Sequence, residues 1–222
     1  MKQLLFFILA LTTSRTILAQ EAVPKSSSHT PPIPVELFVG NRALNILAVT
    51  RKPFKEGGKL GYFNFTNYTG DFKNSGDHNE FASQSLLTYK IAKNLNATAG
   101  FLINHVTGFR KQVGLQYSYA NQKWLVVLVP VVDLADGHNL EMMDLVEFKP
   151  KINDKLKLYT RLQGLIIYDP TEKHHSRSYI TARLGLSVKN YQFGLGHTTD
   201  WYGENRFVKQ NTGLFARVLL EH

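Results

Sequence analysis

Alternation of apolar and polar residues in segments of roughly 9 to 12 residues constrains this chain more than any other feature. In the segment 95–104, the apolar residues Leu95, Ala97, Ala99, Phe101 and Ile103 are opposed by Asn96, Thr98, Gly100 and Asn104. The same alternation recurs around residues 113–119, 156–166, 180–188, 191–196 and 214–221. Successive side chains of a strand point to opposite faces, and a tilted strand of this length crosses a bilayer. The pattern therefore predicts membrane-spanning strands with one apolar and one polar face.

The connections between these segments also alternate. Tight polar turns are expected at 93–96, 120–123, 152–155 and 189–191, whereas longer polar links are expected at 69–80, 106–111, 133–141, 169–177 and 200–211. Outer-membrane barrels have short turns on the periplasmic side and longer loops outside. The connections predict an antiparallel up-and-down meander with this sidedness.

Composition supports a folded chain without membrane helices. Of the 222 residues, 43% are hydrophobic and 19% are charged, which argues against disorder. After the N-terminus, no apolar run approaches the roughly 20 residues of a transmembrane helix, so any crossing is made by strands. The chain has no cysteine. Disulfides, thiolate metal sites, a cysteine nucleophile and a lipoprotein anchor are thereby excluded.

The N-terminus has the layout of a signal peptide. A short basic region, Met1 to Gln3, precedes an apolar stretch from Leu4 to Leu11, which is too short to span a membrane. We expect cleavage after Ala19, so that residues 1–19 form the signal peptide. Residues 20–34 are rich in proline and serine and predict a flexible N-terminal segment. The alternative is an uncleaved membrane anchor.

Three features carry a resemblance to a known class of protein. They are the Ala19–Gln20 junction, the meander from Gly58 onward and the C-terminal amphipathic strand from Thr212 to His222. In these features the chain resembles the outer-membrane β-barrel proteins of Gram-negative bacteria. The resemblance covers essentially all of the mature chain. It implies an outer-membrane location, contact with lipid and lipopolysaccharide, and recognition of the last strand by the assembly machinery. The chain departs from the common pattern because it ends on Leu220-Glu221-His222 instead of an aromatic residue.

The barrel is expected over residues 35–222, most simply with twelve strands and alternatively with ten. Ten strands follow from the C-terminus back to Lys59, and Val35 to Phe54 adds two more with a turn at Gly40-Asn41. An even number keeps both ends in the periplasm. Val35 to Val39 is short for a crossing, so we also considered that it lies inside or beneath the barrel.

Two segments depart from simple alternation. Leu125 to Val132 is apolar on both faces, which predicts a strand whose inner face is buried against the contents of the lumen. Met142 to Phe148 is mixed, with Asp144 and Glu147 on opposite faces.

The inner faces predict a cationic lumen. The residues assigned to the lumen are Lys90, Lys157, Arg161, Gln163, Arg183, Arg217 and Glu221. With few acids expected beside them, chiefly Glu221 and Glu147, such a lumen favours small polar or anionic solutes. The predicted function is a narrow porin-like channel. The alternative is a non-conducting structural barrel, or a subunit of an outer-membrane complex, whose interior is filled by side chains such as Phe215 and Leu219.

An enzymatic alternative rests on His197 and Thr199. They resemble the outward His-x-Ser pair of two barrel enzyme families, outer-membrane phospholipase A and lipid A deacylase. A histidine base also needs a nucleophile and an orienting partner, and the nucleophile position here is threonine. The other explanation is that His197 is an interfacial residue at headgroup level.

No other motif predicts chemistry. Loop metal sites at Glu172, His174 and His175, or at Asp136, His138 and Glu141, require the loops to fold together, and solvated histidines explain them equally well. No phosphate-binding loop or carboxylate pair is present, so we expect no cofactor and no metal.

The net charge of +9 suits anionic lipid headgroups, and no nucleic acid partner is expected. A protein partner is neither indicated nor excluded. The main competing fold is a secreted lipocalin-like barrel, with its apolar faces turned inward to a ligand.

Overall fold

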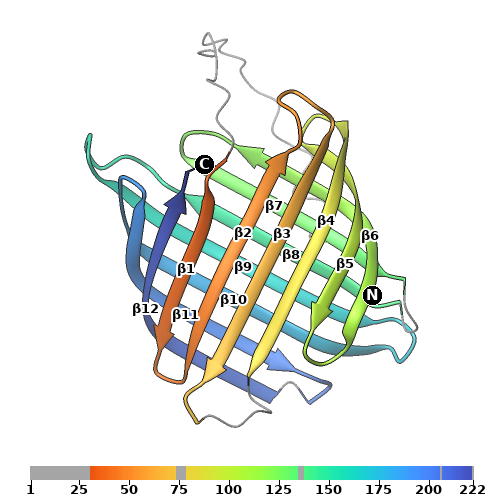
Figure 1. The fold of residues 1–222 in the computed structure, drawn as a ribbon. Coiled ribbons are helices and arrows are strands. Elements are labelled where there is room, and N and C mark those ends of the chain that lie inside the picture. Colours follow the sequence, from red (N-terminus) through yellow and green to blue (C-terminus); the bar gives the residue numbers. More distant parts are fainter. Residues whose placement is uncertain (1–30, 74–78, 135–137, 206, 222) are drawn as a thin grey trace, which may run out of the picture.

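A computed structural model describes residues 31–73, 79–134, 138–205 and 207–221, and the predicted signal peptide lies outside these ranges. The described chain is an all-β structure of twelve strands (Figure 1). The strands are β1 (Ile33–Gly40), β2 (Ala43–Pro53), β3 (Leu60–Asp71), β4 (Glu80–Ala92), β5 (Leu95–Asn104), β6 (Gly108–Ala120), β7 (Trp124–Asp133), β8 (Leu140–Phe148), β9 (Lys157–Asp169), β10 (His174–Val188), β11 (Tyr191–Tyr202) and β12 (Phe207–Leu220). None of the described residues forms a helix long and apolar enough to cross a membrane.

The strands form one closed antiparallel barrel. Each strand pairs with its neighbours in the chain, and β1 closes the ring against β12 from Ile33↔Leu220 to Gly40↔Gly213. The expected twelve strands are confirmed and the alternative of ten is wrong. The suggestion that Val35 to Val39 tucks inside is also wrong, because this segment belongs to β1 and pairs with β2 on its other side.

Asn211 reinforces the closure between β12 and the turn that joins β1 to β2. Its Oδ1 accepts hydrogen bonds from the backbone N–H groups of Arg42 and Ala43, at 3.0 and 3.3 Å. Its Nδ2 donates to the carbonyl oxygen of Ala43 at 3.0 Å. One side chain of the last strand thus satisfies the backbone at the first turn.

The outer surface is apolar and the interior holds the charges. On β10, Ile180 and Leu184 are 49% and 56% exposed, whereas the alternating Thr181 and Arg183 are 8% and 4% exposed. Large apolar side chains turned outward around a wall with buried arginines suit lipid on the outside. A lipocalin-like barrel requires the opposite arrangement, so this alternative is wrong.

We call the end where β1 begins and β12 ends the terminal end, and the other the distal end (Figure 1). The links at the terminal end are 54–59, 93–94, 121–123, 149–156 and 189–190, and those at the distal end are 41–42, 72–79, 105–107, 134–139, 170–173 and 203–206. No link at either end is longer than eight residues, and each end has one link of eight. The predicted contrast between short turns and long loops is therefore largely wrong. Strands β6, β10 and β12 extend into the predicted loops.

Strand β7 faces the lumen with valines. Val127, Val129 and Val131 are buried inside the barrel, as expected for a strand whose inner face meets the contents of the lumen. On β8, Glu147 is buried inside, whereas Asp144 alternates with the inward Met143 and Leu145 and lies on the outer face. The interior is therefore apolar along part of the wall.

Candidate functional site

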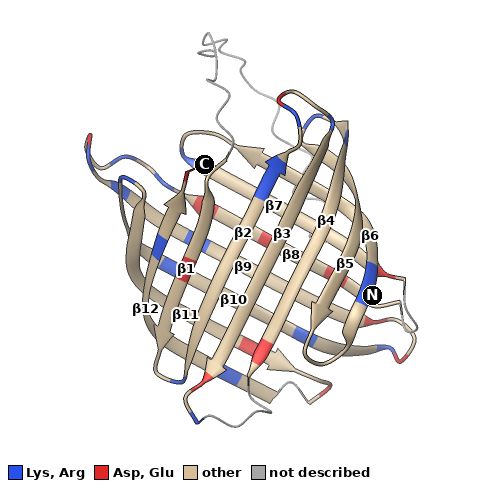
Figure 2. Ribbon diagram, in the orientation of Figure 1, with Lys and Arg blue, Asp and Glu red and all other residues tan. Residues whose placement is uncertain are grey.

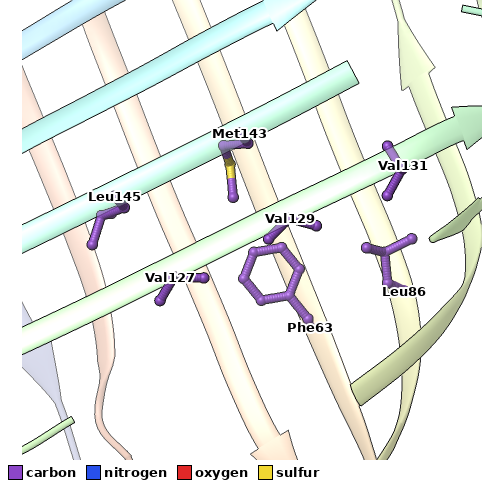
Figure 3. Packing of buried hydrophobic residues seen from close by; sticks show 7 residues of the cluster. All are labelled: Phe63, Leu86, Val127, Val129, Val131, Met143 and Leu145. Carbon is purple, nitrogen blue, oxygen red and sulfur yellow. The ribbon is translucent and has the colours of Figure 1, made fainter. Parts of the chain in front are cut away.

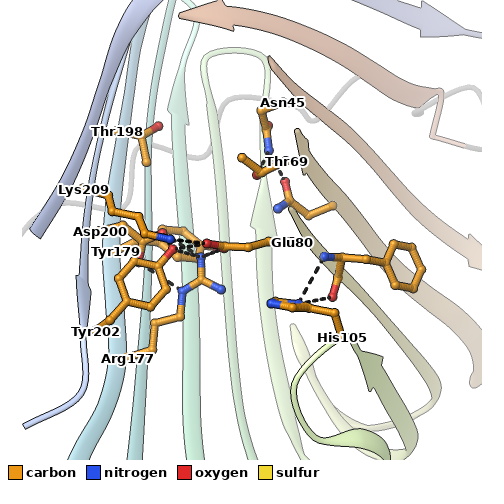
Figure 4. A network of polar contacts seen from close by, with 12 residues as sticks. Asn45, Thr69, Glu80, His105, Arg177, Tyr179, Thr198, Asp200, Tyr202 and Lys209 are labelled. Carbon is orange, nitrogen blue, oxygen red and sulfur yellow. Dashed lines mark hydrogen bonds and ion pairs between the residues drawn. The ribbon is translucent and has the colours of Figure 1, made fainter. Parts of the chain in front are cut away.

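The candidate site is the lumen, which contains three groups of polar side chains and one apolar cluster. At the distal end, Glu80 at the start of β4 reaches across to β10, β11 and β12 (Figure 4). Its carboxylate binds Arg177 at 2.8 Å, Lys209 at 3.1 Å and the Tyr202 hydroxyl at 2.6 Å. Arg177 also pairs with Asp200 on β11 at 2.6 Å. This distal network fixes opposite walls of the barrel to each other.

Halfway along the lumen, one carboxylate lies between two guanidinium groups. Glu36 Oε1 is 2.8 Å from Arg161 Nη2 and 3.0 Å from Arg183 Nε, and all three side chains are almost completely buried. Arg183 also stacks on Phe38, with its guanidinium carbon 4.0 Å from the ring centroid. Gly196 makes room for this stack, because a Cβ there would lie 2.8 Å from the Arg183 side chain and 2.9 Å from the Phe38 ring.

Toward the terminal end, Glu147 on β8 collects three partners. It binds Arg217 at 2.5 Å, Lys149 at 2.7 Å and the Tyr159 hydroxyl at 3.2 Å. Arg217 also donates to the Tyr159 hydroxyl. The Tyr159 and Phe215 rings pack 5.6 Å apart, and with Phe38 they form a small buried aromatic group.

An apolar cluster fills the side of the lumen between β3, β4, β7 and β8 (Figure 3). Its buried members are Phe63, Leu86, Val127, Val129, Val131, Met143 and Leu145. Side chains from β3 and β4 meet those from β7 and β8, which are not their neighbours in the sheet. The cluster thus links two parts of the wall that do not pair in the sheet.

The described residues enclose three cavities of note inside the barrel. The largest, about 430 Å³, lies toward the distal end and is lined among others by Glu80, Asp133 and Glu141. A second, about 200 Å³, lies toward the terminal end beside Arg51 and Arg217. A third, about 60 Å³, lies against β9 to β12. The two larger cavities share Phe65 and Met143 in their linings, so one layer of side chains separates them.

The lumen carries more acids than the sequence pattern predicted. The basic residues that line the three cavities are Arg42, Arg51, Lys149, Arg161, Arg177, Arg183, Lys209 and Arg217. The acidic ones are Glu36, Glu80, Asp133, Glu141, Glu147 and Asp200. Eight basic against six acidic residues leave an excess of only two positive charges, so the expected shortage of acids is wrong.

The charges are unevenly distributed between the ends. The terminal-end cavity is lined by four basic residues and two acids, whereas the largest cavity is lined by two basic residues and three acids. Figure 2 shows an acidic residue at the distal end of β4 and basic residues at the terminal end of β2. Two of the distal acids, Asp133 and Glu141, accept hydrogen bonds from the amides of Gln84 and Gln112.

The structure brings together only part of the predicted lumen set. Arg161, Gln163, Arg183 and Arg217 point inward and are at most 7% exposed. Lys90 and Lys157 lie exposed near the terminal ends of β4 and β9 and line none of the three cavities. Glu221 lies beyond the end of β12 and accepts a hydrogen bond from Asn190 at 3.1 Å.

Sequence reasoning missed several interior residues, among them Glu36, Glu80, Asp133, Arg177, Asp200 and Lys209. Of these, Glu36 alternates with Leu37 and Val39 in β1, and that alternation could have placed it inside. The other five fell within predicted loops.

The enzymatic candidates lie on the outside of the barrel. His197 Nδ1 is 2.7 Å from the Thr212 hydroxyl and its Nε2 is 2.9 Å from the Thr199 hydroxyl. Its partners across the sheet are Ala182 and Thr212. In the part of the chain that the structure describes, the hydrogen-bond partners of His197 are thus hydroxyls and not an orienting acid. This arrangement does not support a catalytic triad.

The candidate metal sites can be compared with the structure only where their residues are described. Among the described residues, no group of three or more histidine, aspartate or glutamate side chains could hold a metal ion. Asp136, one member of the second candidate set, lies outside the described residues.

Comparison with known proteins gives structural matches only. No protein-family model and no curated protein sequence matches the chain. Among solved structures, the NanC porin is 10% identical with a TM-score of 0.47, over 85% of this chain and 98% of that one. The KdgM porin in complex with disordered oligogalacturonate is 10% identical with a TM-score of 0.47, over 86% and 99%. OccK7 (OpdD) of Pseudomonas aeruginosa is 10% identical with a TM-score of 0.40, over 83% and 70%.

Proposed function

We propose that this protein is a narrow porin-like channel of the outer membrane for small polar or anionic solutes, closed in the present conformation by side chains. The observation that carries the proposal is the pair of cavities toward opposite ends, about 430 and 200 Å³, with one side-chain layer between them. The described links between strands lie at the two ends of the barrel, so the layer between the cavities consists of side chains of the wall (Figure 1). The small positive excess of the lining supports a modest preference for anions.

The proposal also places the chain in the cell. Export with cleavage after Ala19 puts the terminal end in the periplasm and leaves the outward apolar faces against lipid and lipopolysaccharide. The last strand, β12, is then the segment that the assembly machinery recognises.

Single-channel recording of the refolded protein in planar bilayers tests the proposal. We compare the wild-type protein with a Phe65→Ala/Met143→Ala double variant, which thins the layer between the cavities, and with Leu184→Ala on the lipid face as the matched control. We expect small, brief openings in the wild type, a several-fold larger conductance in the double variant, and wild-type behaviour in the control. If neither the wild type nor the double variant opens, the channel proposal is overturned.

A selectivity measurement accompanies the recording. Arg51 lines the terminal-end cavity, so Arg51→Gln removes one positive charge from a lining of four basic and two acidic residues. We expect the reversal potential under a salt gradient to shift toward lower anion preference. An unchanged reversal potential in a conducting variant would show that the terminal-end cavity is not on the conduction path.

A second candidate function, a non-conducting structural barrel, is favoured by the ion pairs of Glu36, Glu80 and Glu147, which cross the lumen. Recording separates the two functions. A wild-type barrel that inserts and stays silent, beside a double variant that conducts, supports the structural barrel.

A further inference from the structure

The terminal-end cavity, about 200 Å³, is lined by side chains of two unlike kinds. The apolar ones come mainly from β2, β3, β7 and β8. The charged ones are Arg51, Lys149, Arg161, Arg217, Glu36 and Glu147. A solute that fits both kinds of lining has one charged part and one apolar part.

Two strands show how the two kinds of lining are ordered along the barrel. The inward residues of β2 run Leu47, Val49, Arg51 toward the terminal end, and on β8 Leu145 is followed by Glu147 in the same direction. Residues two apart in a strand share one face, so each series belongs to a single face of the wall. On both strands the lining changes from apolar to charged toward the terminal end.

Arg51 differs from the other basic residues of this cavity in having no fixed partner. Lys149 and Arg217 bind Glu147, and Arg161 binds Glu36, all at 2.8 Å or less. Arg51 forms no ion pair and no hydrogen bond with any of the residues that the structure describes. Its guanidinium group is therefore available to a bound anion.

The lining as a whole also favours an anion. It has four basic and two acidic residues, and one of those acids, Glu36, is shared with Arg183, which lies outside this lining. Positive charge beside an apolar wall is incompletely solvated, and an anion that binds there offsets the cost. One negative charge on the solute thus improves the balance of the cavity.

The apolar side of the cavity disfavours a solute covered with hydroxyl groups. Phe63, Val127 and Leu145 line it and belong to the buried apolar cluster, at 2%, 6% and 8% exposure. A hydroxyl group placed against these side chains loses water and gains no hydrogen-bond partner. An apolar group placed there gains free energy by leaving water.

We propose that the terminal-end cavity binds an organic monoanion with a compact apolar body, with its acid group at Arg51 and its body against Phe63, Val127 and Leu145. The inference rests on the proposed channel function, since it names the class of solute that enters the lumen from the terminal end. Asn121, in the link 121–123, is part of the lining, so the cavity extends to that end. A guanidinium group can donate two parallel hydrogen bonds to one carboxylate.

Titration calorimetry of the refolded protein in detergent micelles, with the heat of empty micelles subtracted, tests the proposal with ring compounds of similar size. Cyclohexanecarboxylate has the charge and the apolar ring, glucuronate has the charge on a hydroxylated ring, and cyclohexanecarboxamide has the apolar ring without the charge. We expect cyclohexanecarboxylate to bind, and each of the others to bind about tenfold more weakly or less. Equal binding of glucuronate or of the carboxamide, or no binding of cyclohexanecarboxylate, would overturn the proposal.

Two variants test the two kinds of lining separately. We expect Arg51→Gln to weaken the binding of cyclohexanecarboxylate about tenfold, and Val127→Thr, which keeps the shape of the side chain, to weaken it several-fold. The matched controls are Lys90→Gln, outside the three cavities, and Val113→Thr on the outer face of β6, and both should bind as the wild type does. Heat-modifiable gel mobility verifies that each variant is folded. Wild-type affinity in a folded Arg51→Gln variant contradicts the proposal.

Calorimetry needs no open channel, so the failure of this inference and the failure of the channel proposal are distinguishable. A barrel that conducts in planar bilayers and does not bind cyclohexanecarboxylate refutes the inference alone. A barrel that binds it through Arg51 and stays silent, in the wild type and in the Phe65→Ala/Met143→Ala variant, supports the binding site and refutes the channel.

Discussion

Glu36 is the shared counter-charge of two arginines. Among the described residues, it is the one carboxylate within ion-pair distance of both Arg161 and Arg183. Its Oε2 has no hydrogen-bond partner, so the pairing depends on Oε1 alone. Removal of one partner from a buried ion pair leaves an uncompensated charge and typically costs about 3 to 5 kcal/mol. The stability of the barrel should therefore depend on the negative charge of the Glu36 carboxylate.

We expect Glu36→Gln to lower the free energy of unfolding by about 3 kcal/mol, because two guanidinium groups lose their shared counter-charge. Urea unfolding in lipid vesicles, followed by tryptophan fluorescence, measures this change. Glu221→Gln is the matched control. The Glu221 carboxylate is exposed and accepts a hydrogen bond from Asn190, so the change in the free energy of unfolding should be close to zero. Equal losses in both variants would mean that the central ion pairs do not stabilise the barrel.

At the scale of the strand, the position of a residue along the membrane normal decides the cost of a charge on the outer face. Leu195 and Tyr191 both face outward on β11 and are 62% and 61% exposed. Leu195 lies closer to the middle of the strand, whereas Tyr191 is its first residue at the terminal end. The two positions thus have the same exposed fraction but lie at different depths along the membrane normal.

We expect Leu195→Arg to destabilise the barrel by about 2 to 4 kcal/mol and Tyr191→Arg by about 0 to 1 kcal/mol, the values typical of the bilayer midplane and of the interface. The same urea titration in vesicles provides both values. If Tyr191→Arg is the more costly variant, the membrane does not lie where the aromatic residues place it.

Most of the strands were predictable, because alternation with period two appears in all but two of the predicted crossings, the exceptions being Leu125 to Val132 and Met142 to Phe148. The ends of the strands were not. Residues such as Glu80, Arg177 and Asp200 lie near strand ends, in stretches rich in polar residues that sequence reasoning assigned to loops. The ion pairs of the lumen were equally hidden, since Glu36 and Arg183 are separated by 147 positions and nothing local indicates that they meet.

For the whole molecule, the unequal charge of the two larger cavities predicts a sided response to anions. The terminal-end cavity has four basic and two acidic lining residues, whereas the largest cavity, toward the distal end, has two basic and three acidic ones. Fixed charge of one sign raises the local concentration of the opposite ion.

In the conducting Phe65→Ala/Met143→Ala variant, we expect a small polyanion to block at lower concentration from the terminal side than from the distal side, with the difference shrinking at high salt. Recording from barrels inserted in one orientation measures both values. Equal block from both sides would mean that these charges do not act on permeating ions.

The hydrogen bonds of Asn211 have a consequence for the order of folding. This side chain binds Arg42 and Ala43, residues that precede it by 169 and 168 positions, so the turn after the first strand gains its partner only when nearly the whole chain has been delivered. Until then β1 and β11 both present unpaired backbone edges, which are templates for pairing with other chains. Contacts of such long sequence separation also form slowly. The time between export of the first strand and arrival of the last is therefore the interval in which this protein is most exposed to misassembly.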